Sequence, residues 1–295
     1  MVEVRAVDLL PRERELYDAV SEFAFRHLGR TGRSSAEHLS LLVLQKELGS
    51  SVQAALRTLK VLTRTARGGR LEKDLDALHQ LAAQVDGQAK LGELERILAE
   101  HDTKVVVFTQ FTATLDFLRT ELEARGISTA QFHGGLDERA KEASVARFRD
   151  RARVLLSTEA GGEGRNLQFC HVLVNYDLPW NPMRVEQRIG RVHRLGQTHD
   201  VHVFNLAARE TIEAYVLETL FRKIRLFELV VGEAESILSQ LNDSSSFEDR
   251  VFWAWNSSDR DEVRRRKFEQ LADEISAAQR RYEQARELDE AILDA

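Results

Sequence analysis

Arginines are concentrated in one short stretch of the chain, residues 181–197, which reads NPMRVEQRIGRVHRLGQ. Asn181 and Pro182 are favoured at the N-cap and the first position of a helix, so a helix has a clear start here. With about 100° between successive residues, a sector of roughly 120° carries the polar side chains Arg184, Gln187, Arg188, Arg191 and Arg194. Glu186 points away from this sector, so we expect few ion-pair partners for it. Such a face repels itself unless it binds an anion, such as phosphate.

A glycine-rich turn precedes this helix. The segment GGEG (161–164) follows a strand-like run at 154–157, and turns of this kind let a backbone approach a phosphate closely. The other side of the helix can pack against a core through its apolar residues Val185, Ile189 and Val192. A solvated basic surface is the plainest alternative for a charged helix. We disfavour it because the glycine turn adjoins the helix and the spacing Gln-Arg-x-Gly-Arg-x-x-Arg is specific.

The elements that must position these residues alternate between strand and helix from residue 88 onward. Short β-branched runs predict strands, and the amphipathic segments between them predict helices of about 10 to 15 residues. The predicted strands are 104–109, 129–132, 153–157, 171–176 and 201–206, with helices at 88–100, 113–124 and 136–148. This alternation predicts an α/β fold with a parallel sheet covered on both faces.

Polar and small residues follow the predicted strands at the edge where ligands gather in such sheets, beyond the carboxyl ends. They are Thr109, Gln110, His133, Gly134, Gly135, Ser157, Thr158 and the loop at Asp177. Each of them could instead be a capping or turn residue. Their occurrence at successive strand ends favours a binding edge.

The flanking regions are predicted to be helical and to carry no chemical constellation. Helices are expected at 11–29, at 38–66 as a pair broken near 49–51, at 71–85, at 211–241 as one or two helices, and from 259 to the end. Residues 242–250 are polar and predict a linker. Trp253 and Trp255 are expected to be anchors onto the main domain rather than platforms on which bases stack. The basic run 264–267 is expected to be a solvated face.

Composition limits the partners that this chain can have. It has 295 residues and a net charge of -6, so any nucleic-acid site must be a local patch. The single cysteine, Cys170, lies in an apolar context and predicts a packing residue. No apolar run approaches the roughly 20 residues that span a bilayer, and the charged N-terminus is unlike a signal peptide. We expect a cytoplasmic, nucleoid-associated protein.

Three segments resemble motifs V and VI of the superfamily-two helicases, in particular the C-terminal motor lobe of Swi/Snf-type ATPases: STEAGGEGRNL, DLPWNP and QRIGRVHRLGQ. The branch they resemble is the bacterial one that includes the RNA polymerase-associated ATPase. Two N-terminal segments resemble the connector after the first motor lobe and the helical insert before the second: LPRERELYDAV and LQKELGSSVQAALRTL. The resemblance implies a helical connector and insert (1–87), a RecA-like lobe (88–207), bracing helices (208–241), and a linker with a charged helix (242–295).

The resemblance also implies roles for single residues in a site where ATP lies between two lobes. Arg191 and Arg194 match arginine fingers, and Gln187 matches a residue that senses the phosphate. Other positions match the nucleotide side of the lobe: Gly162, Glu163, Gly164, Asn166 and Arg188, the last as a structural or relay partner. The positions that match DNA-backbone contacts are Thr109, Gln110, His133, Gly134, Ser157 and Thr158.

A complete nucleoside triphosphatase also needs a phosphate loop with a lysine and acidic ligands for Mg²⁺. No Gly-Lys pair occurs in the sequence, and Asp137-Glu138 begin a predicted helix. We therefore expect ATP and Mg²⁺ to be held mainly by an N-terminal lobe, no metal site on this chain, and no hydrolysis by the isolated chain. That lobe could belong to the same protein, lie on another chain or be absent.

The favoured interpretation is the second motor lobe of an ATP-dependent translocase on double-stranded DNA, with RNA polymerase or another protein complex as a further partner. The alternative is a stand-alone module that binds protein or nucleic acid without catalysis. A nucleotide-binding regulator with a complete site of its own is disfavoured by the missing lysine loop. The coding sequence upstream of Met1 would distinguish these interpretations.

Overall fold

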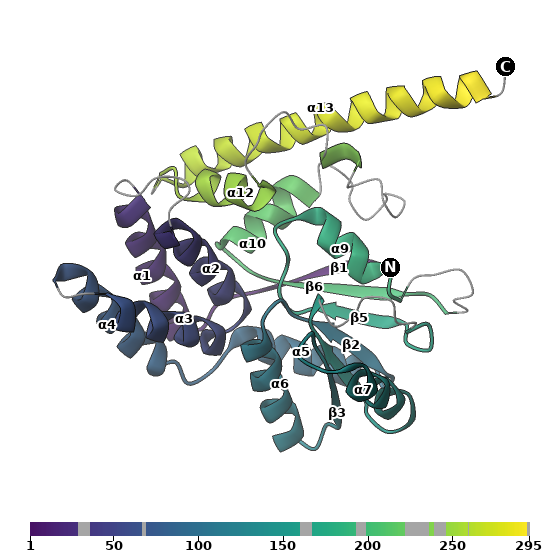
Figure 1. The fold of residues 1–295 in the computed structure, drawn as a ribbon, viewed down its shortest axis with the longest axis horizontal. Coiled ribbons are helices and arrows are strands. Elements are labelled where there is room, and N and C mark those ends of the chain that lie inside the picture. Colours follow the sequence, from purple (N-terminus) through teal and green to yellow (C-terminus); the bar gives the residue numbers. More distant parts are fainter. Residues whose placement is uncertain are drawn as a thin grey trace.

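A single parallel sheet forms the centre of the molecule in the computed structural model, which describes residues 1–28, 36–66, 69–159, 167–192, 199–221, 236–238, 246–258 and 260–293 (Figure 1). The strands are β1 (Val2–Val7), β2 (Val105–Phe108), β3 (Thr129–Phe132), β4 (Val154–Ser157), β5 (Val172–Asn175) and β6 (His202–Ala208). Their order in the sheet is β1-β6-β5-β2-β4-β3, and every neighbouring pair is parallel. The α/β fold with a parallel sheet is confirmed.

The edge strand β1 was not expected from the sequence. It pairs in parallel with β6, with Val2 beside Val203 and Val7 beside Ala208. Val2 and Val4 remain exposed while Val7 is buried, as suits a strand at the edge of a sheet. The predicted helical region 1–87 therefore contributes a strand to the sheet as well as helices.

Helices cover both faces of the sheet because alternate strand residues point to opposite faces. On one face, α5 (Ala89–Glu100) and α6 (Thr112–Ala124) pack over Val105, Val107 and their neighbours. On the other face, α7 (Glu138–Asp150) and α9 (Pro182–Ile189) pack over a second core that includes Val106 and Phe108. Cys170 is buried in this second core, which confirms it as a packing residue.

The N-terminal helices gather beside the sheet and share one core with the C-terminal elements. They are α1 (Pro11–Leu28), α2 (Ala36–Ser50), α3 (Val52–Thr65) and α4 (Arg70–Ala83), seen on the left of Figure 1. Their apolar faces meet α10 (Ile212–Tyr215), the π-helical turn η1 (Val216–Phe221) and the helix α12 (Phe247–Trp255). The linker predicted at 242–250 is wrong for its last four residues, because Ser246 caps α12 by accepting from the Asp249 backbone N–H.

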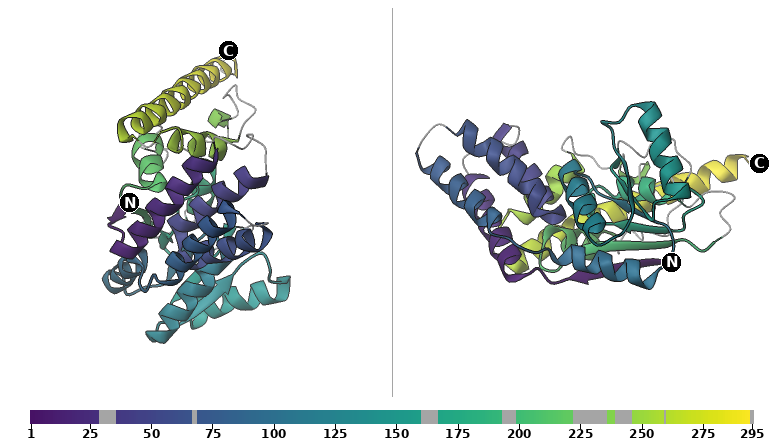
Figure 2. Two further views of the ribbon diagram at one scale, coloured as in Figure 1. Left: turned by 90° about the vertical axis from the view of Figure 1, so that its left-hand side faces the viewer. Right: turned by 90° about the horizontal axis from the view of Figure 1, so that it is seen from below.

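The C-terminal helix α13 (Asp261–Leu293) packs on α12 and η1, and its far end projects beyond the other elements (Figures 1 and 2). Phe268, Leu271 and Ile275 bury one side of its first turns in the helical core. Trp255 anchors this junction: its ring meets Tyr17 and Tyr215 edge-on, and the Arg264 guanidinium lies 4.3 Å from its centroid. Arg264 is thus partly covered, unlike the solvated residue that the sequence predicted.

Within the described part of the chain, no helix is both long and apolar enough to cross a bilayer. The same residues contain no group of three or more His, Cys, Asp or Glu side chains arranged to hold a metal ion.

Candidate functional site

An open cleft of about 720 Å³ lies at the edge of the sheet where the carboxyl ends of β2, β3 and β4 meet α9. Strand-end residues form one wall, and α9 forms the other. The lining residues are Phe108, Gln110, Thr112, Gly134, Gly135, Thr158, Glu159, Asn181, Met183, Arg184, Gln187, Arg188 and Arg191. The fold thus brings together residues of both predicted sets, the nucleotide-facing and the DNA-facing.

The helix α9 begins where the sequence predicted. The Asn181 side chain accepts a hydrogen bond from the Met183 backbone N–H at 3.0 Å, and Pro182 occupies the first turn. Val185 is buried in the helical core, and Val192 in the core on this face of the sheet. The regular helix ends at Ile189, so Arg191 lies in the turn that follows and not on a continued helix.

The four predicted guanidiniums do not share one exposed face. The Arg188 side chain is only 2 % exposed, whereas that of Arg184 is 50 % exposed. Gln187 is exposed, and Arg191 is partly exposed and lines the cleft. The expectation of few ion-pair partners was wrong, because loops at two strand ends supply Glu159 and Asp177.

Arg188 is held by four acceptors and one ring. Its Nη1 donates to the Asn175 side chain at 3.1 Å and to the Asp177 backbone carbonyl at 2.7 Å. Its Nη2 donates to Glu159 at 2.8 Å and to the Asp177 carboxylate at 3.4 Å. The guanidinium also lies over the Phe108 ring, 5.6 Å from the centroid. These contacts fit the predicted role of a structural or relay partner, and they leave little of Arg188 for direct contact with a nucleotide.

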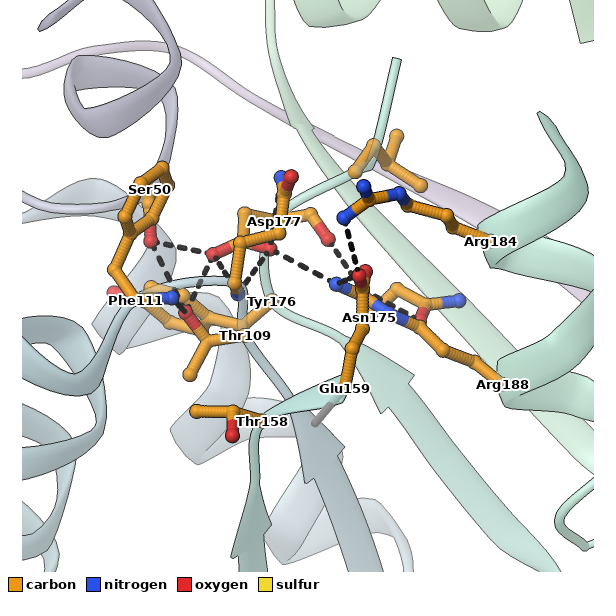
Figure 3. A network of polar contacts seen from close by, with 12 residues as sticks. Ser50, Thr109, Phe111, Thr158, Glu159, Asn175, Tyr176, Asp177, Arg184 and Arg188 are labelled. Carbon is orange, nitrogen blue, oxygen red and sulfur yellow. Dashed lines mark hydrogen bonds and ion pairs between the residues drawn. The ribbon is translucent and has the colours of Figure 1, made fainter. Parts of the chain in front are cut away.

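Asp177 is a fully buried carboxylate that joins three elements (Figure 3). Its Oδ2 accepts from the hydroxyls of Ser50, at the end of α2, and Thr109, at the end of β2, each at 2.5 Å. Its Oδ1 accepts from the Gln110 backbone N–H at 3.0 Å. Together with the contact to Arg188, these bonds satisfy both oxygens, which a buried charge requires.

Two of the predicted DNA contacts point inward. Thr109 and Ser157 are fully buried, and their hydroxyls donate to Asp177 and to the Thr158 carbonyl. Ser157 is the last residue of β4, and Thr109 directly follows β2. Both hydroxyls take part in internal hydrogen bonds, and their role as DNA contacts stays a prediction.

The other predicted DNA contacts differ in exposure. Gln110 is partly exposed, and Gly134 is exposed. His133 shapes its own turn, since its Nδ1 accepts from the Gly135 backbone N–H at 3.2 Å. Thr158 is buried, 5 % exposed, and lines the cleft floor. Gln110, Gly134 and Thr158 share the cleft, whereas His133 does not line it.

Five of the predicted site residues lie outside the described residues. They are Gly162, Glu163, Gly164, Asn166 and Arg194.

A row of alternating charges connects the cleft wall to the flanking helices. Glu159 divides its carboxylate between Arg188 and Arg184, each at 2.8 Å. Arg184 lies 4.0 Å from Glu248 of α12, which in turn lies 3.9 Å from Lys46 of α2. Burial lowers the pKa of Lys46, and the Glu248 carboxylate opposes that shift. In this row α12 thus contacts α9 directly, and α2 is connected to α9 through Glu248.

A buried ion pair fastens the helical layer to the sheet. Lys90 donates to the Glu213 carboxylate at 2.6 Å, to the Gly49 carbonyl at 2.6 Å and to the Tyr176 carbonyl at 3.0 Å. Burial raises the pKa of Glu213 to about 7, and Lys90 opposes that shift. Gly49 has no room for a side chain, because a Cβ there would lie 3.0 Å from the Glu213 carboxyl carbon.

The sequence predicts Asp177 only as part of a loop and does not predict that Ser50, Asn175 or Glu159 belong to the site. The positions of Asp177 and Glu159 could have been predicted, because each lies within two residues after a buried strand. Ser50 gave no signal beyond a helix break, since its partner lies 127 residues away.

Comparison with known proteins identifies the domain that carries this cleft. Residues 89–196 match the helicase conserved C-terminal domain. The chain is 40% identical over 253 residues to YqhH of Bacillus subtilis (strain 168), named an uncharacterized ATP-dependent helicase, covering 85% of this chain and 44% of YqhH. It is 38% identical over 136 residues to the RNA polymerase-associated protein RapA of Erwinia tasmaniensis, covering 45% of this chain and 14% of RapA. The chain spans less than half the length of either relative.

Two solved structures share the fold. The C-terminal part of the Fun30 ATPase domain superposes with a TM-score of 0.56 and 15% identity, over 85% of this chain and 96% of that one. The Sulfolobus solfataricus SWI2/SNF2 ATPase core in complex with double-stranded DNA gives a TM-score of 0.52 and 21% identity, over 85% of this chain and 49% of that one. The chain therefore carries a helicase conserved C-terminal domain with a RecA-like fold, and its relatives include Swi/Snf-type helicases.

Proposed function

We propose that this chain is the second motor lobe of an ATP-dependent translocase on double-stranded DNA, and that it places arginines against ATP held by an N-terminal lobe. The observation that carries the proposal is the division of roles around α9. Arg188 is buried and fixed by Glu159 and Asp177, whereas Gln187 and Arg191 line the open cleft. A fixed arginine in α9 preorganises its neighbours in the helix and in the turn that follows, and preorganised positive charge stabilises a transition state that develops negative charge.

ATP is the nucleotide that the chemistry of the cleft and the names of the relatives favour. Guanidiniums and an amide suit phosphate oxygens, to which they donate several hydrogen bonds at once. The chain has no Gly-Lys phosphate loop, so we assign it half of an ATP site. Mg²⁺ and the remaining phosphate contacts then belong to the other lobe. We also assign Arg194 and residues 162–164 and 166, which lie outside the described residues, to the ATP-facing side of this lobe.

Double-stranded DNA is the polymer that we assign to the strand-end wall, through Gln110 and Gly134, and to the adjoining turn at His133. A relative fold in complex with double-stranded DNA supports this choice. The net charge of -6 predicts that binding by this lobe is weak, independent of sequence and sensitive to salt. RapA is named for its association with RNA polymerase, so we propose a polymerase as the protein partner to test.

The test compares the chain alone with the chain joined to an N-terminal lobe that carries a phosphate loop. Alone, the chain should show no ATP turnover above background, with or without duplex DNA. Joined, it should hydrolyse ATP at about 1 per second or more, an ordinary enzymatic rate, when duplex is present. DNA-stimulated turnover by the isolated chain would contradict the assignment of half a site. A joined protein that binds both lobes' ligands but never hydrolyses ATP would favour the non-catalytic binding module.

DNA binding is tested separately by titrating fluorescent duplexes of two unrelated sequences at two salt concentrations. Equal affinities that fall steeply between about 50 and 200 mM salt fit phosphate contacts. Tight binding that depends on sequence and not on salt would contradict this part of the proposal.

A further inference from the structure

Asp177 lies beneath the cleft, between its two walls. It does not line the cleft, yet it contacts residues that do: Gln110 from the strand-end wall and Arg188 from α9. In Figure 3, Ser50, Thr109 and Phe111 lie on one side of Asp177, and Glu159, Arg184 and Arg188 lie on the other. One buried carboxylate therefore connects the wall that we assign to DNA with the helix that we assign to ATP.

The contacts on the strand-end side hold the backbone as well as side chains. Asp177 accepts from the Gln110 backbone N–H, and the Thr109 hydroxyl that donates to Asp177 also accepts from the Phe111 backbone N–H at 3.3 Å. Any displacement of residues 109–111 by a ligand therefore moves donors of Asp177. Ser50, the last residue of α2, donates to Asp177 at 2.5 Å and so connects this carboxylate to α2.

The contacts on the α9 side hold the orientation of the helix. Arg188 donates to both the carboxylate and the backbone carbonyl of Asp177, and its side chain is almost wholly buried. Gln187 directly precedes Arg188 in the sequence, Arg191 follows it by three residues, and both line the cleft. A change in the hydrogen bonds between Arg188 and Asp177 therefore shifts the short backbone segment 187–191, and with it the side chains of Gln187 and Arg191.

The two sides compete for the same charge. In a poorly solvated interior, a carboxylate and its donors interact strongly, and weakening one bond redistributes the charge among the others. A ligand that draws the Gln110 backbone outward would weaken its bond to Oδ1, which is the oxygen that also faces Arg188. The Asp177–Arg188 contact would then shorten, and the orientation of α9 would become more fixed.

We propose that Asp177 is a positioning residue that couples the binding of duplex DNA at Gln110 to the placement of α9, and through α9 to Gln187 and Arg191. The proposal rests on the proposed function, because it assumes that DNA binds the strand-end wall.

The experiment measures hydrogen exchange of the whole 295-residue chain by mass spectrometry, with and without saturating duplex DNA at low salt. Peptides over 109–112 report the DNA wall, and peptides over α9 report the coupled helix. In the wild type, duplex should slow exchange in both, by about fivefold or more in α9, the lower end of typical coupling between sites. Asp177→Asn keeps the shape but removes the charge, so it should abolish the α9 response while duplex affinity changes by less than about threefold.

Two further variants separate coupling from mere stability. Arg188→Lys keeps the positive charge, but an ammonium cannot reach Asn175, Asp177 and Glu159 together, so it should also abolish the α9 response. Trp255→Ala truncates a buried ring that packs on Tyr17, Tyr215 and Arg264 in the helical core and not on Asp177, so it should lower stability and keep the α9 response.

The outcomes separate this inference from the proposed function. A wild-type chain that binds no duplex overturns the DNA assignment, and the coupling with it. Binding that protects 109–112 but leaves α9 unchanged overturns the coupling alone. Retention of the α9 response by both Asp177→Asn and Arg188→Lys would also overturn it. The coupling would also be overturned if all three variants lost the α9 response in proportion to their loss of stability.

Discussion

Arg188 donates hydrogen bonds to both the backbone carbonyl and the carboxylate of Asp177, although both residues are buried. This pairing converts part of an arginine-rich helix face into an internal anchor. Two other residues of that face, Gln187 and Arg191, line the cleft. Our functional proposal depends on this difference between the buried Arg188 and the partly exposed Arg191.

Arg188 should matter for folding far more than Arg184. Arg188→Met leaves Asp177 and Glu159 without their shared cation, and breaking a buried pair costs about 3–5 kcal/mol. Arg184→Met loses a half-exposed ion pair, which is worth about 1 kcal/mol or less. Urea unfolding of both variants checks this. If both variants lose the same free energy of unfolding, the buried contacts of Arg188 contribute no more to stability than the half-exposed ion pair of Arg184.

Most of the sheet was predictable because its signal is local. Five short apolar runs and the helices between them follow from periodicity, and each predicted strand is confirmed to within two residues at its ends. The strand β1 was missed because two of the six residues of VEVRAV are charged and because β6, its partner among the described strands, lies about 200 residues away in the sequence. An edge strand is specified by its tertiary partner more than by its own composition.

The site was predictable in location and not in orientation. Strand ends place Gln110, Thr158 and α9 at one cleft in any such sheet. A helical wheel gives the angle between Arg184 and Arg188, but it does not say which of them faces the sheet. That choice depends on Asp177 and Glu159, which come from other loops. The burial of Thr109 likewise follows from its carboxylate partner.

Removing Lys90 should destabilise the protein in a pH-dependent way. Lys90→Met leaves the Glu213 carboxyl buried without its cation, at a cost of about 3–5 kcal/mol when that carboxyl is ionised. Burial already raises the pKa of Glu213 to about 7 from its ordinary 4.5. At pH 5 the folded variant keeps Glu213 protonated and neutral, so the loss should be smaller there than at pH 8.

Unfolding of Lys90→Met in urea at pH 5 and pH 8 measures this difference. The double variant Lys90→Met/Glu213→Leu serves as the control, because it removes both charges and should recover part of the stability. A double variant less stable than Lys90→Met at pH 8 would contradict our account of the pair.

Glu47 should weaken the fold as pH rises. Burial raises its pKa to about 7, and its Oε2 has no hydrogen-bond partner among the described residues. Between pH 4.5 and 7 the unfolded chain releases this proton while the folded chain keeps it, so stability falls with pH and the loss is complete above about 7. Glu47→Gln should therefore stabilise at pH 8 by roughly 2 kcal/mol and by much less at pH 5.

Thermal unfolding at the two pH values checks the effect of Glu47. Glu15→Gln, at an exposed position of α1, is the matched control and should change little at either pH. A gain at pH 5 that equals the gain at pH 8 would show that ionisation of Glu47 is not the cause.

Trp255 should fasten the C-terminal helix to the body. Its buried ring contacts Tyr17, Tyr215 and Arg264, and truncation of such a ring costs about 3–5 kcal/mol. Trp255→Ala should also speed tryptic cleavage within α13, which has many arginines. Trp253→Ala, at a less buried neighbouring position, should change cleavage much less. Equal cleavage rates for the two variants would contradict an anchoring role.

The most direct test of the central claim is ATP turnover by the two-lobe protein with Arg191→Ala. Arg191 lines the cleft and is partly exposed, so its loss should lower the melting temperature much less than Arg188→Met does but should lower DNA-stimulated turnover by about 10³-fold, the scale of an arginine finger. Arg191→Lys should not restore the rate, because an ammonium lacks the planar fork of donors. Arg266→Ala, an exposed arginine of α13 outside the cleft, controls for loss of charge. A loss of turnover no greater than that of Arg266→Ala, or one that only follows the unfolded fraction, would contradict the account.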